Sequence, residues 1–280
     1  MTTVRIDGET GYQLFLRMKY GLSEVKLATG VPVFDALLQG KGVGAGDVVD
    51  IFGPPSCGKS QLLMEAICEF IMPKQYKEVK IDGKMGGVVL FDVDGRFSIA
   101  RQVHILEIKI RQRLHGHIPI TDHDCEALIR ECLGRLYVTT CMTNAVALAS
   151  VKDAFKTIPT YSSDDAPVKL VAVDGLCHLQ WSDRLETQRG YGGDWIPRIC
   201  RALKDLQNEH RLMLYVTTNA MTPQAENTGR TAFMGSDWIK STTYRIGIKS
   251  MGDRLLCSLI GCPSVVIQFV ISDSGGAIVH

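Results

Sequence analysis

The chain has 280 residues, of which 45% are hydrophobic and 22% charged, and its formal net charge at pH 7 is +1. This composition excludes intrinsic disorder, and the near-zero net charge excludes a global basic field that would attract nucleic acid. The nine cysteines form no CxxC pair, and the sequence has no run of 18 apolar residues. We therefore expect an intracellular protein of a reducing compartment, without a signal peptide, a membrane span or a zinc site.

Buried strands alternate with helices through most of the chain. The expected strands cover residues 48–52, 87–95, 135–140, 168–174 and 211–218. The expected helices cover residues 61–71, 98–114, 145–155 and 195–209. Because these strands are apolar on both faces, they predict an α/β fold whose mostly parallel central sheet has helices on both faces.

After Trp238 the pattern changes to the short alternating strands TTYRIGIKS, RLLCSLIG and SVVIQFVIS. They predict a C-terminal antiparallel extension of the same sheet. Polar residues at 73–86, 115–124 and 220–237 are expected to form loops. No internal repeat interrupts this order, so the pattern indicates one large domain.

The sequence GPPSCGKS follows the first strand and opens the first long helix, which is the context and spacing of a P-loop. Its glycines let backbone N–H groups converge on phosphate oxygens at a helix N-terminus. Lys59 is expected to reach the β- and γ-phosphates of ATP, and the Ser60 hydroxyl to bind Mg²⁺. A strand-to-helix turn without a ligand is the alternative. The expected nucleotide site consists of Gly53, Pro54, Pro55, Ser56, Cys57, Gly58, Lys59 and Ser60.

Two aspartates follow buried strands farther along the chain. Asp174 ends the strand over 168–174, where a carboxylate suits a second partner for Mg²⁺, although strands also end in Asp for turn formation. Asp94 lies in FDVDG at the tip of the strand over 87–95, which follows the P-loop helix, and a carboxylate there would polarise the attacking water. The alternative for Asp94 is a solvated turn residue.

These motifs together resemble a known family. The stretch TGVPVFDALLQGKGVGAGDVVDIFGPPSCGKSQL resembles the start of the ATPase core of RecA-type recombinases, in which a short helix and a glycine-rich turn precede the P-loop. FDVDGRF is similar to the family's strand with the catalytic glutamate, LVAVDGL to its Walker B strand, and VTTN to its fifth strand. The resemblance covers residues from about 29 to 271. It implies a RecA-like P-loop ATPase core over 29–280, preceded by an interface segment over 1–28.

The departures from the family pattern are similar to those of a eukaryotic recombinase paralogue, as are FIMPK, ECLGRLYV, WSDR and YVTTNAM. Asp94 stands where the family has its catalytic glutamate, and Asn219 where it has a sensor glutamine. Both side chains are shorter by one methylene group, which implies weak or absent ATP hydrolysis. A misplacement of about 1 Å at a reacting centre costs roughly 100-fold in rate.

The resemblance also implies a cellular role, a compartment and binding partners. It predicts a nuclear, ATP- and Mg²⁺-binding subunit that assists homologous recombination and DNA double-strand break repair. The expected partners are other recombinase paralogues in a hetero-oligomer, first of all the D-type paralogue, and DNA reached through that complex. The apolar segment over 12–22 is interpreted as a docking element for a neighbouring subunit or as a strap on its own core.

In the family, the loops after the fourth and fifth strands line the DNA channel. These loops lie at 181–194 and 220–237 here, and their arginines and aromatic residues can hold phosphates and stack bases. The candidate DNA contacts are Arg184, Arg189, Tyr191, Arg230 and Phe233. Nearby carboxylates offset the positive charge, so solvated loops without a strong DNA contact are the alternative.

Two other functions share the P-loop. One is an active DNA-dependent ATPase that performs strand exchange, and the other is a P-loop kinase for a small molecule. No arginine-rich lid segment supports the kinase, and the sequence has neither the NKxD motif of GTPases nor an LSGGQ-like transporter signature. Asp94, Asn219 and the modest charge of the two loops favour a weakly hydrolysing mediator subunit.

Overall fold

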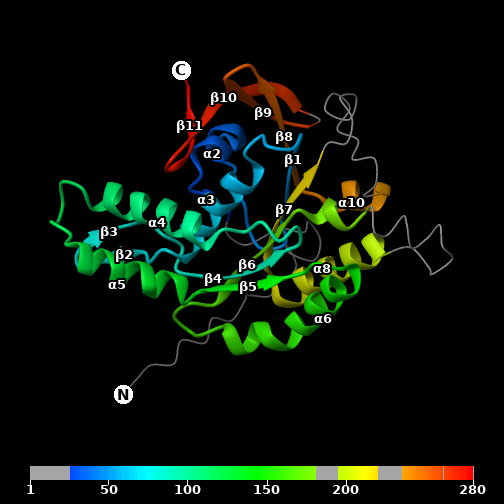
Figure 1. Cartoon of the computed structure of the whole chain (residues 1–280), viewed down its shortest axis with the longest axis horizontal. Helices are drawn as coiled ribbons and strands as arrows, with labels where there is room; N and C mark the ends of the chain where they lie inside the picture. The colour runs from blue at the N-terminus through cyan, green and yellow to red at the C-terminus, as the bar shows by residue number, and fades with distance from the viewer. Residues whose placement is uncertain (1–25, 181–194, 220–234, 261, 280) are drawn as a thin grey trace, which may run out of the picture.

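The computed structural model describes residues 26–180, 195–219, 235–260 and 262–279 (Figure 1). Its centre is a nine-stranded sheet with the order β11-β10-β9-β8-β1-β7-β6-β4-β5. The expected division between an N-terminal segment and the core at residue 28 falls at the start of the described part and stays a prediction. No helix in the described part combines the length and the apolar character needed to cross a membrane.

The strands from β8 to β5 in this order pair in parallel. They are β1 (Val48–Gly53), β4 (Gly87–Asp92), β5 (Leu136–Thr140), β6 (Val168–Asp174), β7 (Met213–Asn219) and β8 (Tyr244–Met251). The last strands pair antiparallel and are β9 (Arg254–Leu259), β10 (Cys262–Ser272) and β11 (Gly275–Ile278). The expected mostly parallel sheet with an antiparallel extension is therefore confirmed.

Helices cover both faces of the sheet (Figure 1). They are α2 (Pro32–Leu38), α3 (Lys59–Ile71), α4 (Ile99–Leu114), α5 (Asp122–Leu133), α6 (Asn144–Tyr161), α8 (Trp195–His210) and α10 (Gly235–Ser241). Alternate strand residues face opposite sides: Leu90 packs in the core beneath α2 to α5, and Phe91 in the core beneath α6 and α8. This alternation divides the apolar side chains into two layers, as expected for a doubly covered sheet.

Several expected boundaries were wrong. The strand expected over 87–95 ends at Asp92, because the Asp92 carboxylate accepts the backbone N–H groups of Arg96 and Phe97 and so turns the chain. The helix expected to end at 155 continues to Tyr161. The first strand after Trp238, β8, pairs in parallel with β1 and not antiparallel.

The segments expected to be loops also contain regular structure. The helix α5 begins inside 115–124, because the Thr121 hydroxyl accepts the backbone N–H of Asp124 and caps the helix. A small hairpin of β2 (Gln75–Tyr76) and β3 (Val79–Lys80) lies inside 73–86. The short helix α10 occupies the end of 220–237.

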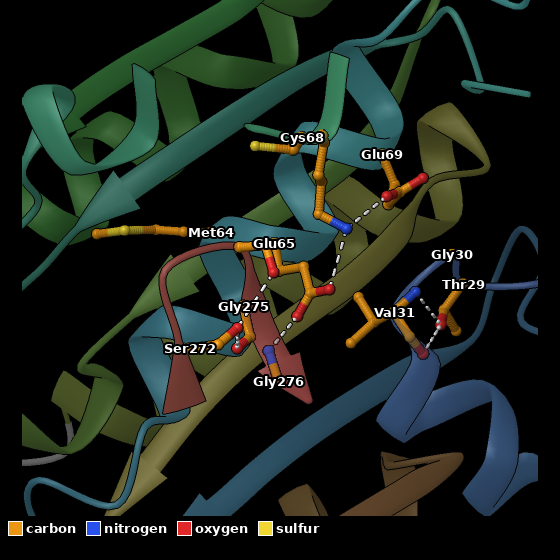
Figure 2. Close-up of polar contacts among 12 residues, drawn as sticks. Thr29, Gly30, Val31, Met64, Glu65, Cys68, Glu69, Ser272, Gly275 and Gly276 are labelled. Carbon is orange, nitrogen blue, oxygen red and sulfur yellow. Dashed lines mark hydrogen bonds and ion pairs between the residues drawn. The ribbon is translucent and has the colours of Figure 1, made fainter. Parts of the chain in front are cut away.

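A buried ionic cluster joins α3, α4 and β11 (Figure 2). The ammonium of Lys109 contacts Glu65 Oε1 at 3.0 Å and Glu69 Oε1 at 2.8 Å. Glu69 also pairs with Arg113 at 2.7 Å, and Glu65 Oε2 accepts the backbone N–H of Gly276 at 2.9 Å. The cluster therefore fixes the P-loop helix α3 to two other elements at once.

Candidate nucleotide-binding site

The loop between β1 and α3 is the candidate phosphate-binding loop, and its glycines are closely constrained. Gly58, the residue before α3, has φ +84°, and a Cβ atom there would lie 2.7 Å from Cδ1 of Ile271 on β10. A Cβ on Gly53 would lie 2.7 Å from the carbonyl oxygen of Ile248 on β8. Gly53 is thus required by the close approach of β8, which the local sequence pattern did not indicate, and Gly58 by its positive φ.

Lys59 is held over this loop. Its side chain is buried, and its Nζ donates to the carbonyl oxygen of Gly53 at 3.0 Å and to that of Pro54 at 2.6 Å. Burial lowers the pKa of Lys59, and the opposing influence of Cys57 and Asp174 is smaller. The ammonium therefore sits where a triphosphate would supply the negative charge that the protein provides only in part.

The two candidate Mg²⁺ residues meet although they are far apart in the sequence. The Ser60 hydroxyl donates to Asp174 Oδ1 at 2.9 Å, across the gap between α3 and β6. Burial raises the pKa of Asp174, while hydrogen bonds from Thr217 and Ser60 lower it. A hydroxyl and a carboxylate oxygen side by side are ligands that fit Mg²⁺ together with phosphate oxygens and water.

Thr217 is a site residue that the sequence analysis missed. Its hydroxyl donates to Asp174 Oδ1 at 2.5 Å and accepts the backbone N–H of Gly175 at 2.7 Å. The side chain on β7 therefore fixes the rotamer of Asp174 and the start of the next turn. A hydroxyl residue near the end of the strand next to β6 was the available signal, but only the strand order makes it a neighbour.

Asp94 lies beside this group, in the turn after β4. A Cβ atom on Gly175 would lie 3.0 Å from Cβ and Cγ of Asp94, so the glycine is what lets the aspartate approach the end of β6. Asp92, the actual last residue of β4, is the register partner of Asp174. Burial raises the pKa of Asp92, and both its carboxylate oxygens accept backbone N–H groups, so its role is to shape the turn that carries Asp94.

Asn219 ends β7 and is the register partner of Gly53, the first residue of the P-loop. The structure thus brings Lys59, Ser60, Asp174, Asp94 and Asn219 to the same carboxyl edge of the sheet. The candidate DNA residues Arg184, Arg189, Tyr191, Arg230 and Phe233 lie outside the described residues. Their role stays a prediction.

Replacing Asp174 by asparagine is expected to weaken the Mg²⁺-dependent part of ATP binding at least about tenfold, because the neutral amide removes the charged oxygen that a hard cation prefers. Affinity for ATP without Mg²⁺ should change little. Titration of Mg²⁺ at a fixed concentration of a fluorescent ATP analogue measures the effect. Asp165→Asn, at an exposed position, is the control; equal Mg²⁺ dependence in both variants would contradict the assignment.

Comparison with known proteins gives a consistent result. Residues 22–117 match the family model described as Rad51. It is 25% identical over 183 residues to "DNA repair protein XRCC2" of Mus musculus, covering 63% of this chain and 57% of the relative. It is 23% identical over 263 residues to "DNA repair protein XRCC2 homolog" of Arabidopsis thaliana, covering 75% of this chain and 70% of that relative.

A third relative is "DNA repair protein RAD51 homolog 2" of Mus musculus, with 33% identity over 104 residues, which is 37% of this chain and 28% of the relative. The chain thus spans little more than half the length of the mouse XRCC2 protein it matches. The Rad51 match and the RAD51 paralogues confirm the resemblance to the recombinase family and to its paralogue subgroup.

Proposed function

We propose that this chain, whose residues 22–117 match the Rad51 family model, is an ATP- and Mg²⁺-binding protein that assists homologous recombination and double-strand break repair in the nucleus. The observation that supports nucleotide binding is the convergence of Lys59, Ser60 and Asp174 at one loop that depends on glycine. The words "DNA repair" in the names of the mouse and Arabidopsis relatives support the proposed role in DNA repair.

The residues fit the nucleotide and its metal. Lys59 and the backbone N–H groups of residues 56–60 would hold the phosphates, while Ser60 and Asp174 would hold Mg²⁺. Bound Mg²⁺ would neutralise phosphate charge and polarise the terminal phosphoryl group. The chain's own part would be to position and desolvate the phosphates, and Asp94 and Asn219 are polar side chains at the same edge of the sheet.

We further propose that hydrolysis by the isolated chain is weak. A carboxylate that activates water must reach it within hydrogen-bond distance, and Asp94 has one methylene group less than glutamate. The Asp94 carboxylate also accepts the backbone N–H of Arg96 at 3.2 Å, which draws it into its own turn. Binding of ATP without efficient turnover suits a subunit in which the nucleotide stabilises assembly.

Phosphate release measured with and without single-stranded DNA tests this proposal against the alternatives. The mediator function predicts nucleotide binding with little turnover and little stimulation by DNA. Strong stimulation by single-stranded DNA would favour the strand-exchange ATPase. Rapid transfer of phosphate to a small-molecule acceptor, independent of DNA, would favour the kinase.

Replacing Asp94 by glutamate is expected to raise ATP turnover at least about tenfold, because the added methylene group restores reach toward the attacking water. Phosphate release at saturating ATP and Mg²⁺ measures the gain. Asp165→Glu, an equal change at an exposed position, is the control. Turnover that stays at the wild-type level in Asp94→Glu would remove Asp94 from the catalytic role.

Assembly with RAD51-type partners is supported by the open edge of the sheet. The edge strand β5 pairs with β4 alone within the described residues, and Val138 on β5 is 42% exposed. Met142 and Val146, just after β5, are 61% and 45% exposed. Unpaired edge strands with exposed apolar side chains are typical docking surfaces. Co-purification from native cells and identification of stoichiometric partners, the D-type paralogue first, tests this point.

A further inference from the structure

A lysine-lined hollow lies at the opposite edge of the sheet from the P-loop. Its volume is about 500 Å³, and its wall contains Lys74, Lys80, Lys84 and Lys169, with Asp82 as its carboxylate. Lys169 stands near the start of β6 and Asp174 at its end, so at about 3.3 Å per residue the hollow is roughly 17 Å from the candidate Mg²⁺ residues. The nucleotide site therefore does not use these lysines.

Among the described residues, the lysines of the hollow have no ion-pair partner, whereas some other cations of the chain do. Elsewhere Lys109 pairs with two buried glutamates, and Lys26 lies 3.2 Å from Asp47. In the described part of the chain, none of the four ammonium groups of the hollow has a carboxylate within the 4.0 Å of an ion pair. The hollow thus gathers positive charge that side-chain ion pairs leave uncompensated.

Two of these ammonium groups are held in place. Lys84 Nζ donates to the carbonyl oxygen of Thr29 at 2.8 Å and lies 5.1 Å from the ring centre of Phe70. Lys169 Nζ donates to the carbonyl oxygen of Lys84 at 2.8 Å. Each ammonium has three donors, and each uses one of them in these bonds, so donors remain for a ligand.

The electrostatics agree with this geometry. Burial lowers the pKa of Lys169, and the charge of Lys74 lowers it further. Burial also lowers the pKa of Lys84, while the negative charges of Glu69 and Asp35 raise it by a smaller amount. An anion in the hollow would offset the cost of burying the charged forms of Lys84 and Lys169, because it would supply the negative charge that these half-buried ammonium groups lack nearby.

We propose that the lysine-lined hollow binds phosphate groups of a single-stranded DNA backbone, which makes it a second anion site separate from the P-loop. Lysines act as point charges for phosphate, and the part of the lining that the structure describes has no aromatic ring to stack a base. The contact is therefore independent of base sequence. A flexible single strand can place a phosphate in a hollow of this size. A stiff duplex cannot bend into the hollow and would contact a broader surface. The choice of DNA as the ligand rests on the proposed function in DNA repair.

Charge reversal at the rim tests the proposal. Lys74 and Lys80 are exposed, so Lys74→Glu/Lys80→Glu should leave the fold intact, which thermal unfolding checks. Fluorescence anisotropy of a labelled oligonucleotide, with the full chain at low salt, should show at least about tenfold weaker binding. The slope of log affinity against log salt should fall by about 1.4, or about 0.7 for each lost phosphate contact.

Lys152→Glu/Lys156→Glu is the matched control, because these lysines are exposed on α6 and the change in net charge is the same. It should bind DNA within about twofold of the wild type, and oligonucleotides of different sequence should bind alike. Equal loss in both variants, or no measurable DNA binding by the wild type, overturns the proposal. A phosphorylated peptide that binds the hollow where DNA does not would also overturn it.

A fluorescent ATP analogue, measured on the same proteins, separates this proposal from the nucleotide function. Retention of ATP-analogue binding by Lys74→Glu/Lys80→Glu together with loss of DNA binding supports two separate anion sites. Failure of the wild type to bind the ATP analogue would overturn the proposed function, while the DNA comparison between the two charge-reversal variants still decides the role of the hollow.

Discussion

Replacing Lys59 by alanine is expected to weaken ATP binding to the isolated chain at least about 100-fold, which corresponds to roughly 3 kcal/mol. The ammonium is buried at the loop, where hydrogen bonds to charged groups contribute about 1.5–3 kcal/mol each. The hydrogen bonds that Lys59 now makes to Gly53 and Pro54 are available for exchange against phosphate oxygens. Equilibrium titration with a fluorescent ATP analogue measures the loss.

Lys152→Ala, at an exposed position on α6, should bind the analogue as the wild type does. Thermal unfolding without nucleotide checks that Lys59→Ala is folded, and added ATP should raise the melting temperature of the wild type alone. An unchanged affinity in folded Lys59→Ala would refute the assignment of residues 53–60 as a phosphate-binding loop.

Replacing Lys109 by methionine is expected to lower the free energy of unfolding by about 3 kcal/mol, because removal of one partner leaves a buried charge uncompensated. Glu69 would keep Arg113, but Glu65 would retain only the backbone N–H of Gly276 (Figure 2). Urea unfolding followed by circular dichroism measures the loss. Arg111→Met, which removes exposed ion pairs of the same helix α4, should change stability little.

The stability difference between Lys109→Met and the wild type should shrink as the pH falls from 8 to 5. Burial already raises the pKa of Glu65 while the charge of Lys109 lowers it, so loss of Lys109 should raise that pKa further. A carboxyl whose pKa is higher in the folded than in the unfolded state takes up a proton on folding, so folding gains stability as the pH falls through the folded pKa. A difference that stays constant or widens toward acid pH would show that Glu65 is not stranded.

Much of the candidate nucleotide site could be predicted because its signal is local. The spacing from Gly53 to Ser60 between a buried strand and a helix defines both the backbone shape and the charge of the loop. Asp174 was found for a similar reason, since it ends a strand that is apolar on both faces. The contact of Ser60 with Asp174 agrees with that reading.

The errors lie where a local pattern competes with a contact made elsewhere. FDVDG reads as a strand to its end, but the Asp92 carboxylate captures two following N–H groups and stops β4 earlier. The strand β8 reads like the strands that follow it, yet its pairing with β1 is parallel. The helix α5 was overlooked although Thr121 is a good N-cap and Cys125, Leu128, Ile129 and Cys132 have helical spacing.

The sequence by itself determined the mostly parallel α/β sheet, the spacing of the P-loop motif and the resemblance to the recombinase family, because periodicity and short motifs are properties of neighbouring residues. Only the tertiary structure decided which distant side chains meet: Thr217 on Asp174, Ile271 over Gly58, and the lysines from 74 to 169 around one hollow. The physical reason is strand order. Parallel strands join residues that are far apart along the chain, and a one-dimensional pattern carries no record of which strand lies next to which.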